Sequence, residues 1–371
     1  MSLSQAGEDE SRSSTDTVCS IDDLLRKILV GLPLSSLHMC KSVCKRWFSL
    51  ITDPTFCPNK TDHPCGLFLQ LQSPSAEFAY VPLFRHPPLI KTTIFPFHHP
   101  KKPQHIEVWQ SCNGLLLCYD HPDKLYVYNP TINQFKLLPL HHVWKPYNIF
   151  DNSMALAFDP ALSHHYKLLY HVRKDDDVTH VYVEIYSSET CTWRAYDKTF
   201  SSVSFVAFDH SAVYWRGAIH WLSHRAVYHF SLEDIDNPHF IQVENHKTMH
   251  AYGGYDKLLV SRDCLLLVMM LQPLMVDVYE VENDCYSGWC LKYYVDLEFV
   301  GNFPGPEVDV LAIVLGDREE DSFLVLEVPG IMLVKYNIMS KTFYQLCNLI
   351  RIQILPTKFC SFLFTPSLVG V

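Results

Sequence analysis

Several patterns that mark metal-binding, nucleic-acid-binding or secreted proteins are missing from this sequence. Its 13 cysteines include no Cys-x-x-Cys pair, so zinc-finger spacing is absent and reduced, buried thiols are expected. Lysine and arginine do not cluster beyond pairs and triplets, and the formal net charge is −10. A phosphate-binding surface needs a basic patch, so we predict no nucleic-acid partner.

Membrane and catalytic signatures are missing as well. The longest apolar run, Cys264 to Leu271, is far below the ~20 residues of a membrane helix. The N-terminus is polar and acidic and resembles no signal or transit peptide, which predicts a cytoplasmic and/or nuclear protein without a membrane partner. No Gly-x-Ser-x-Gly, P-loop, Gly-x-Gly-x-x-Gly or His-Glu-x-x-His motif occurs. We therefore predict no catalytic residue, no metal and no cofactor.

Residues 20–56 carry the clearest helical pattern. Asp22 and Asp23 suit a first helical turn, Gly31 and Pro33 end the helix, and a second helix follows as far as Asp53-Pro54. Such short helices cannot bury all their apolar side chains among themselves, so either the rest of the chain or a partner covers them. The first helix has apolar residues at i, i+3, i+4, i+7, i+8 and i+11, namely Ile21, Leu24, Leu25, Ile28, Leu29 and Leu32.

From Gly66 onward the pattern changes to short strands separated by turn residues. A unit of an aromatic residue, a polar turn and a second aromatic residue recurs, with first aromatics 44 to 58 residues apart, which is a propeller-blade period. Where the two aromatics are seven apart, they can face each other across a hairpin. Unpaired strands remain at both ends of this region, and because a ring must close, we predict that they form a sixth blade. The five units begin at Tyr128, Tyr186, Phe230, Tyr279 and Tyr336.

Two stretches resemble a known family. Residues 20–56 resemble an F-box, the motif that binds the Skp-type adaptor of SCF ubiquitin ligases, although Ser20-Ile21 stands where the family usually has Leu-Pro. The stretch SCNGLLLCYD and the following LYVYNPTINQFKLLP resemble the F-box-associated domain of plant F-box proteins. The F-box match rests on Asp23-Leu24-Leu25, Ile28-Leu29, Leu32-Pro33, Ser36-Leu37, Val43-Cys44-Lys45, Trp47, Leu50-Ile51 and Asp53-Pro54-Thr55-Phe56.

The resemblance implies a multidomain α plus all-β chain: a short helical F-box followed by a kelch-like β-propeller of six blades. The expected parts are a disordered tail (1–18), the F-box (19–60) and the propeller-like domain (61–371). Such a protein is a non-catalytic substrate receptor, bound through its adaptor to cullin and RING subunits, that presents an unknown target protein for ubiquitination and degradation. The predicted adaptor-binding residues are Ile21, Leu24, Leu25, Ile28, Leu29, Leu32, Pro33, Leu37, Val43, Cys44, Lys45 and Trp47.

Alternatives remain open at each site. The helices could pack on the propeller, so that their apolar residues form part of the chain's own hydrophobic core. The loop with His141, His142, Trp144 and Tyr147 has the large amphipathic side chains suited to target recognition, and the alternative is that these side chains pack between blades. The chain could also be an adaptor-binding scaffold without a degradation target, or a propeller that binds a small ligand.

Overall fold

The computed structural model describes most of the chain, which divides into two compact units, Met1–Thr61 and Asp62–Val371. The predicted tail, residues 1–18, lies outside the described residues. Every structural statement below refers to residues 22–32, 34–53, 56, 66–70, 77–84, 91–94, 106–120, 124–139, 152–174, 177–201, 212–223, 226–232, 240–244, 256–272, 274–282, 288–298, 300, 308–328, 331–349 and 361–371.

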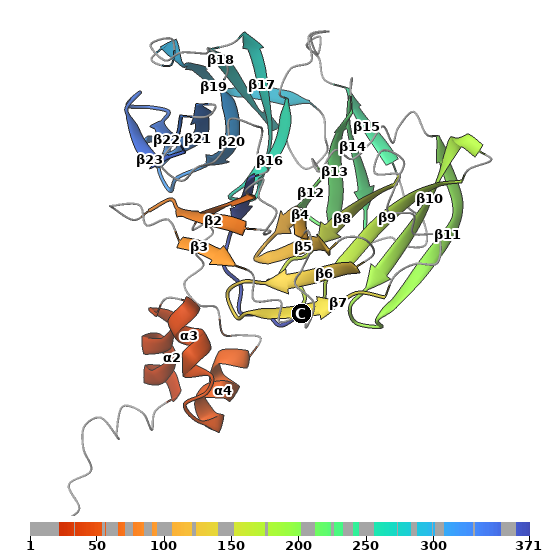
Figure 1. The fold of residues 1–371 in the computed structure, drawn as a ribbon, viewed down its shortest axis with the longest axis vertical. Coiled ribbons are helices and arrows are strands. Elements are labelled where there is room, and N and C mark those ends of the chain that lie inside the picture. Colours follow the sequence, from red (N-terminus) through yellow and green to blue (C-terminus); the bar gives the residue numbers. More distant parts are fainter. Residues whose placement is uncertain are drawn as a thin grey trace, which may run out of the picture. The chain divides into compact units, whose positions relative to one another are not determined.

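The first unit contains three short helices, α2 (Asp22–Val30), α3 (Leu34–Cys40) and α4 (Lys45–Thr52) (Figure 1). The predicted single second helix is therefore wrong, because turns at residues 41–43 divide it into α3 and α4. Two ion pairs join α2 to the α4 region: Asp22 with Arg46 at 2.6 Å, and Arg26 with Asp53 at 2.7 Å. Arg26 follows Asp22 on the α2 side, and Asp53 follows Arg46 on the α4 side. The two helices therefore run side by side in the same direction.

The second unit consists of six four-stranded antiparallel sheets, the blades of a propeller. Blade 1 is β4–β7, blade 2 β8–β11, blade 3 β12–β15, blade 4 β16–β19 and blade 5 β20–β23, whereas blade 6 has the order β24-β1-β2-β3. The strands are β1 (Gly66–Gln70), β2 (Glu77–Pro82), β3 (Lys91–Ile94), β4 (Ile106–Cys112), β5 (Leu115–Asp120), β6 (Lys124–Asn129), β7 (Gln134–Leu137), β8 (Asn152–Ala157), β9 (Lys167–Lys174), β10 (Asp177–Ser187), β11 (Thr192–Ser201), β12 (Val213–Trp215), β13 (Ala218–Ser223), β14 (Ala226–Ser231), β15 (Phe240–Glu244), β16 (Lys257–Ser261), β17 (Cys264–Gln272), β18 (Met275–Val281), β19 (Trp289–Asp296), β20 (Asp309–Val314), β21 (Phe323–Val328), β22 (Met332–Asn337), β23 (Phe343–Asn348) and β24 (Ser361–Phe364).

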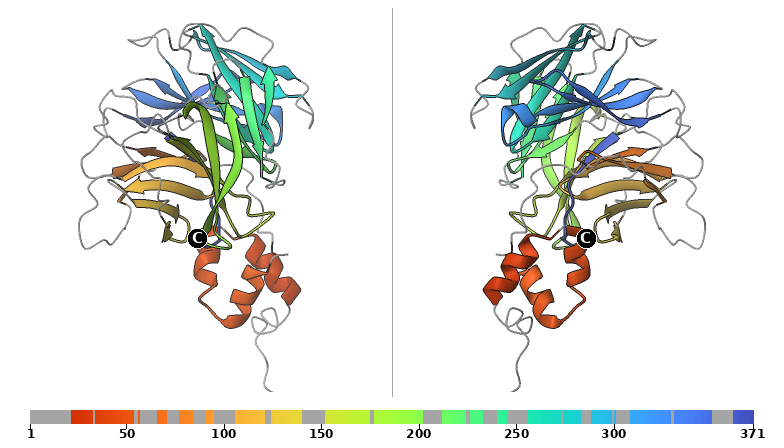
Figure 2. Two further views of the ribbon diagram at one scale, coloured as in Figure 1. Left: turned by 90° about the vertical axis from the view of Figure 1, so that its right-hand side faces the viewer. Right: turned by 90° about the vertical axis from the view of Figure 1, so that its left-hand side faces the viewer.

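The first strands of the blades form a closed ring. Each of these strands contacts the next one around the ring, in the order β4, β8, β12, β16, β20 and β24, and β24 contacts β4. Figure 1 shows β4, β8, β12, β16 and β20 towards the middle of the propeller and strands such as β7, β11 and β23 on its outside, and Figure 2 shows the blades from two further sides. The fold is thus the six-bladed propeller that the sequence predicts.

Blade 6 closes the ring with strands from both ends of the unit. The C-terminal strand β24 pairs antiparallel with β1, in a register that runs from Gly66 opposite Phe364 to Leu69 opposite Ser361. The predicted pairing of the C-terminal strand with the N-terminal strands is therefore confirmed. The predicted aromatic pairs seven residues apart also lie directly opposite one another across their hairpins: Tyr128 with Phe135, Tyr186 with Trp193 and Tyr336 with Phe343.

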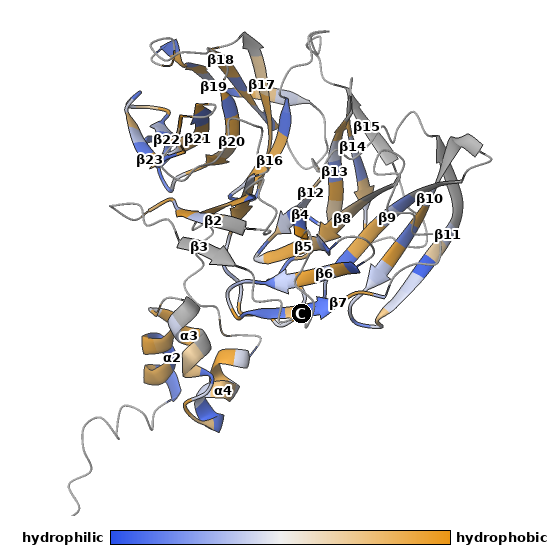
Figure 3. Cartoon of the chain, in the orientation of Figure 1, coloured by the Kyte–Doolittle hydropathy of each residue, from blue (hydrophilic) through white to orange (hydrophobic). Residues whose placement is uncertain are grey.

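The hydrophobic core lies between the blades. Six clusters of buried apolar residues fill the described protein, and each consists of residues from two neighbouring blades. A strand between two such layers buries both of its faces, as β5 and β21 do along their whole length. Figure 3 shows the resulting hydrophobic strands beside hydrophilic outer strands such as β7.

Candidate functional sites

The predicted adaptor-binding residues of the helical unit divide by burial. Leu25, Leu29 and Leu37 are at most 1% exposed, so in this structure they hold the helices in place. Leu32 and Trp47 are half-buried, and Cys44 and Lys45 are exposed. Ile21 and Pro33 lie outside the described residues. Among the predicted residues, the large apolar side chains left on the surface are Leu24, Ile28 and Val43, at 40%, 51% and 60% exposure.

Helix geometry explains how α2 provides both kinds of residue. Leu24 and Ile28 stand four residues apart and share one side of the helix, as do Leu25 and Leu29. Each position along an α-helix turns by about 100°, so the two pairs form neighbouring stripes. The Leu25–Leu29 stripe is buried and the Leu24–Ile28 stripe faces solvent.

Two further apolar residues of the helical unit are exposed, Met39 at 66% and Phe48 at 53%. Neither residue was predicted from the sequence, although Met39 precedes Val43 by four positions and Phe48 directly follows Trp47. With Leu24, Ile28 and Val43 they make up what we call the exposed apolar set. Exposed apolar side chains of this kind are candidates for contact with a partner.

The predicted target-binding residues cannot be placed in the same way. His141, His142, Trp144 and Tyr147 lie outside the described residues. Their segment links the outermost strand of blade 1, β7, to the innermost strand of blade 2, β8. Their role in target recognition stays a prediction.

The residues that carry the resemblance in the β region serve ring closure. The fully buried Asn129 side chain donates hydrogen bonds to the carbonyl oxygens of Ser367 at 2.9 Å and Val369 at 2.7 Å. Thr131 Oγ1 accepts a hydrogen bond from the Ser367 amide at 3.1 Å. Gly114, with φ of 95°, approaches the same segment so closely that a Cβ atom would lie 2.5 Å from Ser367 Cβ. Residues 365–371, which we call the C-terminal strap, are therefore bound across blade 1.

Turns between the first and second strands join neighbouring blades. Asn113 and Arg216 stand in such turns with φ of 44° and 43°, a backbone conformation that non-glycine residues rarely adopt. Asn113 Nδ2 donates to the Phe158 carbonyl of blade 2 at 2.7 Å, and Arg216 pairs with Asp263 of blade 4 at 2.8 Å. These contacts give the turns a structural role.

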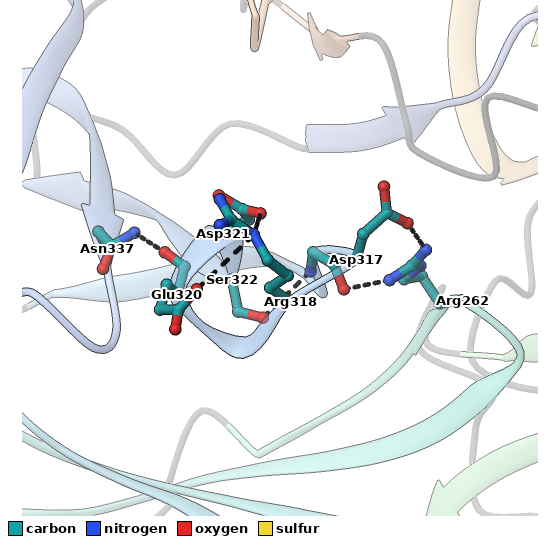
Figure 4. A network of polar contacts seen from close by, with 8 residues as sticks. Arg262, Asp317, Arg318, Glu320, Asp321, Ser322 and Asn337 are labelled. Atoms are coloured by element: carbon teal, nitrogen blue, oxygen red, sulfur yellow. Dashed lines mark hydrogen bonds and ion pairs between the residues drawn. The ribbon is translucent and has the colours of Figure 1, made fainter.

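The same arrangement recurs between blades 4 and 5, where Figure 4 shows a polar network. The Arg262 guanidinium donates to the Gly316 carbonyl and pairs with the Asp317 carboxylate. Within blade 5, Asn337 Nδ2 donates to the Glu320 carbonyl at 2.6 Å. The acidic loop before β21 is thus held by contacts from blade 4 and from within blade 5.

A buried histidine pair lies in blade 3. His220 and His229 are directly opposite on β13 and β14, with ring centroids 5.6 Å apart, and Trp215 packs on His220 at 5.5 Å. Burial, together with His229, lowers the pKa of His220 to about 3, so the ring is neutral in the folded protein. Across the described parts of the chain, no three His, Cys, Asp or Glu side chains gather into a possible metal site. None of the described helices is long and apolar enough to cross a membrane.

Comparison with known proteins agrees with both units. The F-box domain family matches residues 22–59, and the family described as F-box associated beta propeller domain matches residues 81–245. The chain is 30% identical to F-box protein At5g07610 of Arabidopsis thaliana, over 91% of this chain and 88% of that protein. It is 24% identical to F-box protein At5g49610 of the same plant, over 76% of this chain and 81% of that protein.

An F-box in general binds a Skp1-type adaptor, and proteins that carry one typically serve as non-catalytic substrate-recognition subunits of SCF complexes. The helical unit, the six-bladed ring and these relatives together establish that the chain belongs to the plant F-box proteins with an F-box-associated β-propeller domain.

Proposed function

We propose that this chain recruits one specific target protein to an SCF ubiquitin ligase for ubiquitination and proteasomal degradation. In this proposal the exposed apolar set of the helical unit binds the Skp-type adaptor, and the propeller holds the target. The main support for this proposal is that Leu24, Ile28 and Val43 are exposed. The propeller closes with its own strands, so it does not need these side chains for its core. Burial of a large apolar side chain contributes roughly 1.5–3 kcal/mol, so several together can offset the ~4–15 kcal/mol cost of association.

The proposed mechanism is proximity rather than covalent chemistry. The adaptor connects the chain to cullin and to the RING subunit, which brings a ubiquitin-charged enzyme. Holding the target on the propeller raises the effective concentration of its lysines near that enzyme. No residue of this chain takes part in bond formation, and the role requires a cytoplasmic or nuclear location.

Adaptor capture tests the first half of the proposal. Full-length protein, the double variant Ile28→Asp with Val43→Asp, and the control Leu162→Asp would each be used to capture purified adaptor. Leu162 is 73% exposed on the propeller. We expect the control to bind like the wild type and the double variant to bind at least tenfold more weakly, since two exposed apolar contacts are replaced by charges. Equal binding by the double variant, with its helical content intact, would refute the assignment.

Target capture tests the second half. The chain would be purified from plant cells with the proteasome blocked, and co-purifying proteins identified by mass spectrometry. A protein whose ubiquitination depends on this chain supports the receptor role. A stable adaptor complex that yields no such protein would instead favour a scaffold role.

A further inference from the structure

Cys191 lies in an unusual position on the surface of blade 2. It occupies the turn between β10 and β11 with φ of 56°, and its side chain is exposed. Lys136 of β7, in the neighbouring blade, places Nζ 3.3 Å from Cys191 Sγ. The thiol also contacts the Ser188 carbonyl oxygen at 3.5 Å. An exposed sulfur thus lies beside a lysine ammonium group that a different blade supplies.

A buried hydroxyl faces the same sulfur from inside the blade. Tyr186 is fully buried on β10, and its ring packs against Trp193 with centroids 5.3 Å apart. Its hydroxyl is buried without a hydrogen-bond partner among the described residues, and burial together with the neighbouring Cys191 thiol raises its pKa to about 12. Buried polar groups normally find strong partners, so this position suits an additional acceptor atom on the sulfur.

The chain contains a natural counterexample in Cys290, which is also exposed on the propeller. The Cys290 thiol donates to Glu282 Oε1 at 2.9 Å, and this carboxylate raises the pKa of Cys290. At Cys191 the neighbouring Lys136 has the opposite effect and lowers the thiol pKa. The thiolate is the reactive form of cysteine, so the two exposed thiols differ in reactivity for a defined electrostatic reason.

We propose that Cys191, Lys136 and Tyr186 form a site at which hydroperoxides reversibly oxidise this protein. The Cys191 thiolate attacks one peroxide oxygen; a sulfur–oxygen bond forms and the oxygen–oxygen bond breaks. Sulfur loses two electrons, and the departing oxygen leaves as water or an alcohol after it takes a proton from Lys136 or solvent. The new sulfenic oxygen accepts hydrogen bonds from Lys136 and from the Tyr186 hydroxyl. A cellular thiol then returns the sulfur to the reduced state through a mixed disulfide.

The test compares both cysteines within one molecule. Reduced full-length protein would be treated with hydrogen peroxide in the presence of dimedone, and the Cys191 and Cys290 peptides quantified by mass spectrometry. We expect Cys191 to be labelled at least severalfold faster than Cys290, because Lys136 favours the Cys191 thiolate, Glu282 disfavours the Cys290 thiolate, and the thiolate is the form that attacks peroxide. Its rate of iodoacetamide alkylation should also reach half-maximum at a lower pH.

Three variants test the roles of Lys136 and Tyr186. Lys136→Met should reduce the Cys191 rate towards that of Cys290, whereas Lys136→Arg keeps the positive charge and should restore it. Tyr186→Phe should shorten the lifetime of the sulfenic acid, measured by adding dimedone after peroxide has been removed. The melting transition of each variant verifies its fold. Equal labelling of Cys191 and Cys290, or a Cys191 rate unchanged in Lys136→Met, would overturn the proposal.

Discussion

Asn129 and Ser367 lie 238 positions apart in the sequence, yet the Asn129 side-chain amide donates a hydrogen bond to the Ser367 carbonyl oxygen. A second bond from the same amide reaches Val369. One buried side chain therefore satisfies two carbonyl groups of the C-terminal strap. The strap continues directly from β24, so blade 1 and blade 6 both depend on the last residues of the described protein.

Replacing Asn129 with Ala should lower the stability of the whole ring. The change removes both hydrogen bonds and leaves the carbonyl groups of the buried Ser367 and the partly buried Val369 without them, which costs roughly 1–3 kcal/mol. Thermal denaturation followed by circular dichroism measures the effect. The control Leu162→Ala alters an exposed side chain and should stay within about 0.5 kcal/mol of the wild type. If Asn129→Ala and this control had the same melting temperature, the hydrogen bonds between Asn129 and the strap would not stabilise the ring.

Gly114→Ala should destabilise the ring at the same place. Its φ of 95° disfavours a side chain, and the added methyl group would also meet the Thr365 carbonyl oxygen at 2.7 Å. We expect a loss of roughly 1–3 kcal/mol in urea denaturation. Gly288→Ala is the matched control, because its nearest neighbour would lie at an ordinary 3.5 Å. Similar losses in both variants would show that the contact with the strap is unimportant.

Deleting residues 357–371 removes both β24 and the strap, and should abolish cooperative melting of the propeller. Blade 6 would lose its innermost strand, and the edge of β1 would be exposed. A shorter deletion of 365–371 keeps β24 and should lower the melting temperature by a smaller amount. If the longer deletion left the melting transition unchanged, closure by β24 would not stabilise the ring.

The sequence predicted the ring better than it predicted the contacts that close it. Paired aromatics such as Tyr186 and Trp193 mark hairpins because their spacing depends only on a short turn. The strand–strand pairing of blade 6 followed from the need to close the ring. The partner of Asn129 could not be predicted, because nothing local in the sequence indicates which distant segment a buried amide will bind.

The spacing of apolar residues also fails to predict burial where both faces of a strand are covered. Leu115, Leu116 and Leu117 are consecutive and all buried, since side chains on alternate faces of β5 enter different layers between blades. In α2 the reverse occurs. Its apolar residues form one broad helical face, but the structure buries only Leu25 and Leu29. Which part of a broad apolar face is covered depends on tertiary packing, which the spacing alone does not contain.

Acidification should weaken the propeller through His220. Burial lowers its pKa to about 3 from the ordinary value of about 6.5, so the unfolded chain takes up a proton at a higher pH than the folded protein. The stability linked to His220 is therefore complete above pH 6.5 and decreases as the pH falls towards 3. The slope is at most roughly 1.4 kcal/mol per pH unit for this one proton.

Urea denaturation at pH 6.5, 6.0 and 5.5 measures this dependence. Other groups also titrate, so the informative quantity is the difference in slope between the wild type and His220→Phe, which keeps a ring against Trp215. We expect the variant to have the shallower slope. Identical slopes would mean that His220 is not the group that takes up the proton.

Neighbouring positions in α2 should separate stability from adaptor binding. Leu29 is fully buried, so Leu29→Ala should destabilise the helical unit by roughly 2–5 kcal/mol. Ile28→Ala removes a similar side chain from an exposed position and should leave helix stability within about 0.5–1 kcal/mol of the wild type, while it weakens adaptor binding. Hydrogen exchange of the α2 and α4 amides reports on the first effect, and titration with purified adaptor on the second. If Ile28→Ala bound the adaptor with wild-type affinity and Leu29→Ala lost binding while its amides stayed protected, the buried stripe rather than the exposed one would be the binding surface.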